Sequence, residues 1–354
     1  MSILDSRSNL KDQQMFFGDG HFIQEFIQPK YPWALKSVDQ QLAQQWPFDE
    51  FALKLDAAQL ASSNQAIRHI FTSNLQSQIA ADSIQGRGPA WLIPYVSDSN
   101  LEYAFNVWGT IESLHSRTYT RIVTSMYPNP KLVMDMVDQK PEILQRFKLC
   151  TEAYDTFFAN PTKENLVLLI AAINILEGLS FYISFICNFG FANMGLFESV
   201  AKYLRQISFD ERLHVALTQN ILNTWRKGVD GGEWVQIWND NSTKIRNMWL
   251  DAVNTEISVW NPYLFKYGTP IIGVTVNNIA DSVEFYGNKR MKNLGIKPFS
   301  KITKDPLPWM QTKYLSNKAY QAAPQEVSVS EYLKNPIDKI QETNNLRTLL
   351  LNGI

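Results

Sequence analysis

One long apolar segment limits the folds open to this chain of 354 residues. From Leu166 to Phe197 nearly every side chain is apolar, and no Lys or Arg occurs between Lys163 and Lys202. Such a segment either crosses a membrane or forms a helix buried on nearly all sides of a large bundle. We expect the buried helix, because the segment carries Asn174, Glu177 and Asn188 and is the only one of its kind.

Helical spacing dominates the rest of the chain. Strand-like alternation is rare, and stretches rich in glycine or proline separate the segments. We predict an all-α bundle over residues 1–321 in which consecutive helices lie side by side. Residues 322–354 are poor in apolar side chains, which indicates a tail that leaves the bundle; a surface helix packed back on it is an equal alternative. The predicted helices are 56–85, 99–127, 141–159, 161–189, 197–225, 233–258 and 276–294.

Composition excludes several classes of protein. A net charge of −1 offers no basic surface for nucleic acid or an anionic membrane. Cys150 and Cys187 are too few for a disulfide framework and are not spaced as a Cys-x-x-Cys pair. The first residues are polar and contain no apolar signal core. We therefore expect a soluble protein of a reducing compartment, the cytoplasm, with neither nucleic acid nor a membrane as a partner.

Two of the four histidines follow a glutamate by three residues, in Glu112-Ser-Leu-His115 and Glu211-Arg-Leu-His214. Residues three apart on a helix share a face, so the carboxylate and the imidazole can reach one metal ion together. In four-helix proteins with a carboxylate-bridged metal pair, two helices carry this motif and two others add one carboxylate each. The alternative is a pair of ordinary surface motifs.

Two further acids suit the remaining positions. Glu177 is the only acid between Glu164 and Glu198, and an isolated charge in so apolar a segment is costly unless it is neutralised, paired or bound to metal. Asp82 lies near the end of the predicted helix that precedes the first motif, where helix capping is the alternative role. Four carboxylates and two imidazoles suit a pair of Fe or Mn ions. The predicted ligands are Asp82, Glu112, His115, Glu177, Glu211 and His214.

A tyrosine shares the helix face of the first motif. Tyr119 is four residues after His115, which places it within a turn or two of the predicted metal site. Phe181, Phe185 and Ile207 project from facing helices and would form a dry apolar pocket around this tyrosine. Ordinary core packing is compatible with the same four side chains.

With these residues identified, the sequence resembles the small, radical-generating subunit of class I ribonucleotide reductase, a ferritin-like helical protein. The resemblance covers most of the chain and includes the tyrosine four residues after the first motif histidine and a Pro-Gln-Glu-Val sequence near the end. Di-iron ferritins share the ligand pattern but neither of these features. The stretches that carry the resemblance are 82–87, 112–119, 176–182, 210–214 and 323–332.

The resemblance implies a role for individual residues. The six ligands would hold two iron ions, or manganese or a mixed Mn/Fe pair, that activate dioxygen and oxidise Tyr119 to a tyrosyl radical. Trp46 matches the family's radical-transfer tryptophan, and Asp210 would hydrogen-bond both Trp46 and His115. Tyr332 would pass the radical equivalent to the large catalytic subunit, where ribonucleotides are reduced to deoxyribonucleotides. A homodimer is also implied.

The chain's own motifs agree with this division of labour. It contains no G-x-x-x-x-G-K loop and no G-x-G-x-x-G fingerprint, so no phosphate-binding loop is evident. Two departures from the family pattern are Phe209, where a small or basic residue is expected, and an apolar chain end with Arg347 in place of an acidic one. Two other hypotheses are a ferritin-like oxidase that acts directly on a small substrate and a helical scaffold without activity.

Overall fold

The computed structural model describes residues 14–18 and 24–316, and within these it is built from helices with a single isolated bridge between Phe16 and Val96. The chain separates into a compact unit that ends at Met310 and a second unit that begins at Gln311. The predicted tail, with Tyr332, lies outside the described residues. The helices are α1 (Pro32–Ala43), α2 (Lys54–Ser62), α3 (Gln65–Gln85), α4 (Gly88–Leu92), η2 (Ile93–Tyr95), α5 (Ser99–Met126), α6 (Pro130–Asp135), α7 (Pro141–Ala159), α8 (Lys163–Ile175), η3 (Leu176–Ser180), α9 (Phe181–Asn193), α10 (Glu198–Arg226), α11 (Gly232–Thr255), η4 (Glu256–Trp260), α12 (Asn261–Leu264), α13 (Val276–Asn293) and η5 (Met310–Tyr314).

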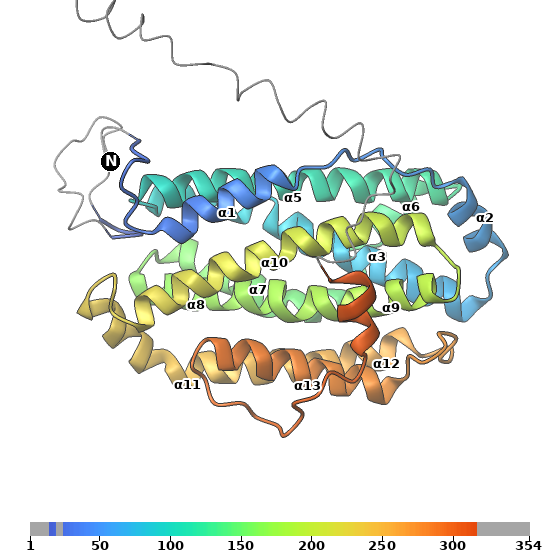
Figure 1. Ribbon diagram of the computed structural model, residues 1–354. Helices are drawn as coiled ribbons and strands as arrows, with labels where there is room; N and C mark the ends of the chain where they lie inside the picture. The colour runs from blue at the N-terminus through green and yellow to red at the C-terminus, as the bar shows by residue number, and fades with distance from the viewer. Residues whose placement is uncertain (1–13, 19–23, 317–354) are drawn as a thin grey trace, which may run out of the picture. The chain divides into compact units, whose positions relative to one another are not determined.

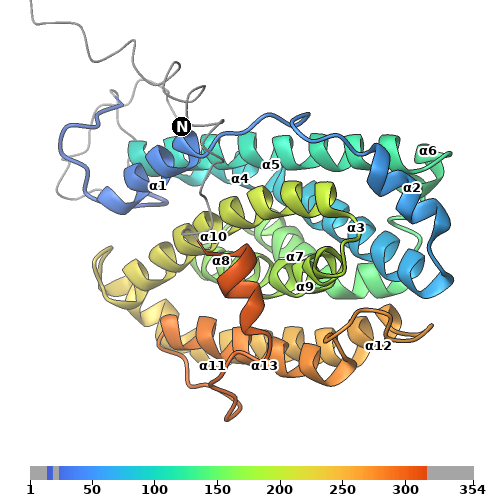
Figure 2. The same cartoon turned by 45° about the vertical axis from the view of Figure 1, so that its right-hand side comes forward.

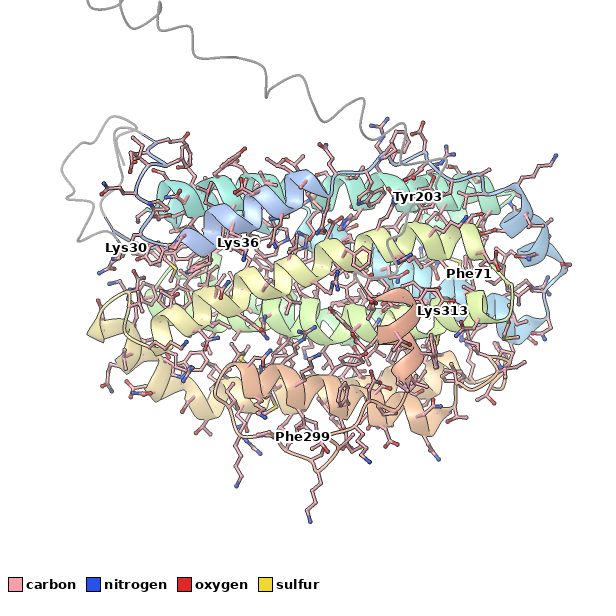
Figure 3. All side chains as sticks on the ribbon, viewed as in Figure 1. Lys30, Lys36, Phe71, Tyr203, Phe299 and Lys313 are labelled. Atoms are coloured by element: carbon pink, nitrogen blue, oxygen red, sulfur yellow. The ribbon has the colours of Figure 1, made fainter. Side chains whose placement is uncertain are left out.

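Four long helices form the centre of the first unit, namely α3, α5, α10 and the continuous run of α8, η3 and α9. α3 packs against α5 and α9, and α10 packs against α5, α8 and α9. Both views show α1 on one side of this core and the pair α11 and α13 on the other (Figures 1 and 2). Side chains fill the space between these helices (Figure 3). The predicted all-α bundle is confirmed.

The long apolar segment is a buried helix, as predicted. Lys163–Asn193 is long and apolar enough to cross a membrane, but every residue of its most apolar stretch is buried inside the protein. The segment is a continuous run of α8, η3 and α9, and Thr162 caps its start by accepting a hydrogen bond from the backbone N–H of Asn165 (3.2 Å). The π-helical turn η3 contains Glu177. A π-turn inserts one extra residue into the helix, and such turns are frequent at functional sites.

The prediction of one helix over residues 56–85 was wrong. The chain breaks after Ser62, and Asn64 starts α3 by accepting a hydrogen bond from the backbone N–H of Ile67 (3.0 Å). An Asn at this position satisfies a backbone donor that the first helical turn leaves free, so a new helix begins here. The separate α2 carries Asp56, whose carboxylate accepts a hydrogen bond from Val200 N (2.8 Å) at the start of α10. A side chain from a distant helix thus caps the helix that carries the second Glu-x-x-His motif.

The segment between α1 and α2 is held against α10. The Tyr203 hydroxyl accepts a hydrogen bond from the Phe51 backbone N–H (2.7 Å) and donates one to the Phe51 carbonyl (3.0 Å). Figure 3 labels Tyr203 on α10. The Trp46 ring lies 6.3 Å from that of Tyr203, so the same contacts hold Trp46 beside α10.

Candidate metal centre

Six buried side chains from four elements meet inside the core. Asp82 comes from the last turn of α3, the first motif from α5, Glu177 from η3 and the second motif from α10. None of the six has measurable exposure to solvent. The structure therefore brings together all six predicted ligands: Asp82, Glu112, His115, Glu177, Glu211 and His214.

The six side chains form two groups of four with ligand atoms close enough to bind one ion each. Asp82 and His115 belong only to the first group, and Glu177 and His214 only to the second. Glu112 and Glu211 belong to both. Two carboxylates shared between two donor sets are what a pair of bridged metal ions requires. Each donor group also contains one imidazole.

The buried oxygen and nitrogen atoms of this cluster need a partner that the protein does not supply. Both carboxylate oxygens of Asp82 lack a hydrogen bond, as do Glu112 Oε2, His115 Nδ1, Glu177 Oε2 and Glu211 Oε1. Leaving so many buried polar atoms unpaired costs several kcal/mol, at about 1–3 kcal/mol for each group. Metal ions would satisfy them, and the mixture of carboxylate and imidazole donors suits Fe or Mn. The residues present therefore fit a dinuclear metal site.

Each imidazole presents Nδ1 to the cluster and Nε2 to a fixed acceptor. His115 Nδ1 lies 3.2 Å from Glu211 Oε1, and His214 Nδ1 lies 3.0 Å from both Glu112 Oε1 and Glu211 Oε2. On the far side, His115 Nε2 donates to Asp210 Oδ2 (3.1 Å). His214 Nε2 donates in the same way to Gln41 Oε1 (3.2 Å). These acceptors select the tautomer in which the Nδ1 lone pair faces a metal ion.

Two of the carboxylates are also oriented by donors outside the cluster. Trp108 Nε1 donates to Glu112 Oε1 (2.8 Å), and Gln85 Nε2 donates to Glu177 Oε1 (2.6 Å). In both residues the second oxygen, Oε2, has no hydrogen bond. The outer donors therefore hold one oxygen of each carboxylate and leave the other for a metal ion.

The pKa values of the buried carboxylates and imidazoles are shifted by burial and by one another's charges. Burial raises the pKa values of Asp82 and Glu177 well above their ordinary range, and neighbouring carboxylates raise them further. Burial opposes ionisation of Glu112 as well, but the imidazoles of His214 and His115 hold its pKa below the ordinary value. Burial disfavours the charged form of His214, yet the charges and hydrogen bonds of Glu112 and Glu211 together outweigh burial and raise the pKa of His214 to about 9. Bound divalent cations would replace these protons, so metal uptake releases protons.

Tyr119 is buried without exposure, and its hydroxyl has no hydrogen bond within normal distance. Burial, followed by the charges of Asp82 and Glu211, raises its pKa well above that of a free phenol. Phe181, Phe185 and Ile207 are buried in the same core, and the two phenylalanine rings stack 6.1 Å apart. That these three side chains enclose Tyr119 stays a prediction.

Trp46, Asp210 and His115 are connected. Asp210 Oδ2 accepts hydrogen bonds from Trp46 Nε1 (2.9 Å) and from His115 Nε2 (3.1 Å). The Trp46 and His115 rings are nearly parallel, 6.1 Å apart with 16° between their planes. Trp46 is 7% exposed, which places it between the cluster and the surface. One carboxylate oxygen thus links an indole near the surface to a buried imidazole of the cluster.

Phe209 has basic neighbours. The guanidinium of Arg212 lies 4.3 Å from its ring centroid, and that of Arg205 lies 5.4 Å away. Phe209 is buried, and both guanidinium groups lie over its ring. Arg212 also interacts electrostatically with Asp210, so a positive charge acts on this carboxylate although position 209 itself is not basic.

Sequence reasoning assigned no role to four side chains: Trp108, Gln85 and Gln41, which bond to ligands, and Tyr154, which bonds to Gln85. Trp108 and Gln85 had a recoverable signal, because they stand four residues before Glu112 and three after Asp82 on the same helix faces. Gln41 and Tyr154 had none, because α1 and α7 reach the cluster only through the tertiary fold.

Comparisons with known proteins decide the family. Residues 24–306 match the family described as Ribonucleotide reductase, small chain. The chain belongs to the ribonucleotide reductase small-chain family. Over 94% of both chains it is 32% identical to the ribonucleoside-diphosphate reductase subunit beta of Haemophilus influenzae.

Solved structures of ribonucleotide reductase small subunits share the fold. The R2 subunit from Clostridium botulinum superposes with a TM-score of 0.79 at 23% identity, covering 88% of this chain and 97% of that one. The dimanganese(II) form of a Streptococcus sanguinis protein has a TM-score of 0.62 at 16% identity, over 77% and 92% of the two chains.

The resemblance found in the sequence is therefore confirmed. The chain is an oxidoreductase subunit, the small subunit of a class I ribonucleoside-diphosphate reductase, with a ferritin-like fold. Family and buried donor cluster together support a dinuclear metal centre in it.

Proposed function

We propose that this chain generates and stores a tyrosyl radical on Tyr119 for a large catalytic subunit that reduces ribonucleotides. The observation that carries the proposal is the pair of buried donor groups that share Glu112 and Glu211, next to a buried tyrosine on the same helix. The ligands would be the six residues of this cluster, which hold two iron ions; manganese or a mixed Mn/Fe pair would use the same donors.

When bound, the metal pair supplies a strong one-electron oxidant driven by dioxygen. Tyr119 then loses one electron and the phenolic proton together, because its raised pKa keeps the phenol protonated beforehand. Asp82 is the carboxylate whose charge acts most strongly on Tyr119, so it would receive the proton. Phe181, Phe185 and Ile207 would exclude water and reductants from the resulting phenoxyl radical.

Trp46, Asp210 and Tyr332 would carry the radical equivalent to the partner. Asp210 keeps the Trp46 indole and the His115 imidazole in one hydrogen-bonded arrangement, which supports transfer of an electron together with a proton. Tyr332 lies in the tail outside the described residues, and the tail would dock on the large subunit. We further propose a homodimer that acts in the cytoplasm without nucleic acid or membrane.

Reconstitution with Fe(II) and oxygen, with Mn(II), or with both tests the proposal. The expected result is two metal ions per chain and an electron paramagnetic resonance signal of a tyrosyl radical. Tyr119→Phe should keep the metal count and lose the signal, whereas Glu177→Ala should reduce the metal count. Two metals without any radical under all three loadings would contradict the proposal, as would fewer than two metals in the wild type.

A further inference from the structure

A chain of hydrogen bonds reaches the cluster from α7. The Tyr154 hydroxyl donates to Gln85 Oε1 (3.1 Å), and Gln85 Nε2 donates to Glu177 Oε1 (2.6 Å). Gln85 and Glu177 are buried without exposure, and Tyr154 is 6% exposed. Burial raises the pKa of Tyr154 well above the ordinary value, so its hydroxyl is a donor throughout the neutral range.

The direction of these bonds fixes the glutamine amide. A glutamine side chain can present either its oxygen or its nitrogen to a neighbour. Because an ionised Glu177 carboxylate can only accept, the amide nitrogen must face Glu177, and the amide oxygen then accepts the proton of the Tyr154 hydroxyl. The amide then binds Glu177 Oε1, and Oε2 is left without a hydrogen bond inside the cluster. An amide does not readily pass a proton along, so this chain orients groups and is unsuited to conduct protons.

The backbone of α4 is adapted to the Tyr154 hydroxyl. A Cβ atom on Gly88 would lie 1.8 Å from the Tyr154 oxygen, so only glycine leaves room for the hydroxyl at this point. The Tyr154 ring stacks on Phe158, with 6.1 Å between centroids. A surface cavity of about 230 Å³ reaches Tyr154 between α4 and α7. Stacking on Phe158 therefore holds the Tyr154 ring, and the missing side chain at Gly88 leaves room for its hydroxyl.

We propose that Tyr154 and Gln85 are positioning residues for the metal centre, which hold the Glu177 carboxylate so that Oε2 points to the metal bound by Glu177 and His214. This inference rests on the proposed dinuclear site. Partners of this kind, beyond the ligands themselves, typically change metal affinity by about 10–100-fold when removed. Tyr154 acts through Gln85, so its effect is expected at the lower end of that range.

Titration of the chelator-treated full-length protein with Co²⁺ alone tests the inference, because the visible absorption of Co²⁺ reports its ligands and geometry. Gln85→Met keeps the length of the side chain and removes the amide, and Tyr154→Phe keeps the ring and removes only the hydroxyl. We expect two Co²⁺ per wild-type chain. In Gln85→Met the site that contains Glu177 and His214 should lose about 10–100-fold in affinity for Co²⁺, in Tyr154→Phe about tenfold, and both spectra should change.

Tyr127→Phe is the matched control. It also removes a partly buried tyrosine hydroxyl, which bonds to Thr72 Oγ1 (2.8 Å) and contacts no ligand of the cluster. This variant should bind Co²⁺ like the wild type. Gly88→Ala should act in the same direction as Tyr154→Phe, and thermal unfolding of each metal-free variant establishes that it is folded.

The outcomes separate the two proposals. Fewer than two Co²⁺ in the wild type would refute the dinuclear site itself. Two Co²⁺ in the wild type, with unchanged affinity and spectrum in both Gln85→Met and Tyr154→Phe, would overturn only the positioning role. An equal loss in Tyr127→Phe would overturn it too, because the effect would then be a general consequence of removing a buried hydroxyl.

Discussion

Replacing Glu256 by Met is expected to destabilise the protein by about 3–5 kcal/mol, because it leaves the guanidinium of Arg146 buried without its counter-charge. The Arg146 side chain has no exposure and that of Glu256 has 1%. Arg146 lies on α7 and Glu256 begins the π-turn η4. Arg146→Met should cost a similar amount, since it leaves the carboxylate buried and alone.

The magnitude follows from the hydrogen bonds of the guanidinium, all five of whose N–H groups are used. Nε and Nη2 donate to the two carboxylate oxygens of Glu256 at 2.7 and 2.9 Å. Nη1 donates to the hydroxyls of Ser77 (2.6 Å) and Ser184 (2.9 Å), and Nη2 also donates to the carbonyl of Ser180 (2.7 Å). No donor can turn to water, so loss of the carboxylate is not compensated.

The double variant Arg146→Met/Glu256→Met separates the two contributions. It removes both charges and leaves only the Ser77, Ser184 and Ser180 acceptors without their donor. At about 1 kcal/mol for each hydrogen bond, it should cost roughly 3 kcal/mol or less, well below the sum of the single variants.

Thermal unfolding followed by circular dichroism, with every variant in the same metal-loading state, measures the cycle. An unfolding entropy near 2.1 cal/mol/K per residue gives about 0.7 kcal/mol per kelvin for this chain length, so each single variant should lower Tm by about 4–7 °C. Additive losses in the double variant would refute the reasoning, because they would show that neither charge depends on the other.

Three further predictions concern other positions. Gly190→Ala should lower stability by about 1–3 kcal/mol, because its Cβ would lie 2.6 Å from Ile271 Cγ2. Gly109→Ala should be neutral or stabilising, because its Cβ would meet nothing closer than 3.9 Å. Chemical denaturation of the two variants compares these effects. Burial raises the pKa of Asp230, so the contribution of its protonated form to stability is fully present below the unfolded pKa of about 3.9 and is lost as pH rises through the folded pKa. Asp230→Asn should flatten that part of a curve of stability against pH. An unchanged slope would contradict the assignment. Asp210→Asn should retain both metals but turn over ribonucleotides with the large subunit far more slowly, and full activity in that assay would exclude Asp210 from the transfer route.

Much of the candidate site could be predicted from local sequence. A glutamate and a histidine three residues apart on a helix must share a face, so the two motifs indicated metal ligands before any fold was known. Glu177 stood out because a lone acid in a long apolar helix requires a compensating charge. The extent of most long helices followed from their periodicity and from the glycine and proline residues between them.

Other features had no local signature. The break between α2 and α3 was missed because Asn64 resembles any polar residue on a helix surface, and only its bond to Ile67 N marks a new start. The π-turn at Glu177 was also missed, since one extra residue in an apolar helix leaves the pattern of burial unchanged. Asp56 caps α10 from 144 residues away, which no sequence spacing reveals.

Residue type and short-range spacing were sufficient to predict the buried helical core, the six candidate ligands and the family. The tertiary structure alone decided how the ligands are oriented. Gln41 and Gln85 hold individual atoms of the cluster, and Tyr154 holds Gln85, through contacts between helices that are distant in the chain. A side chain's type limits what it can bind, but the direction in which it presents its lone pairs depends on neighbours that only packing brings together.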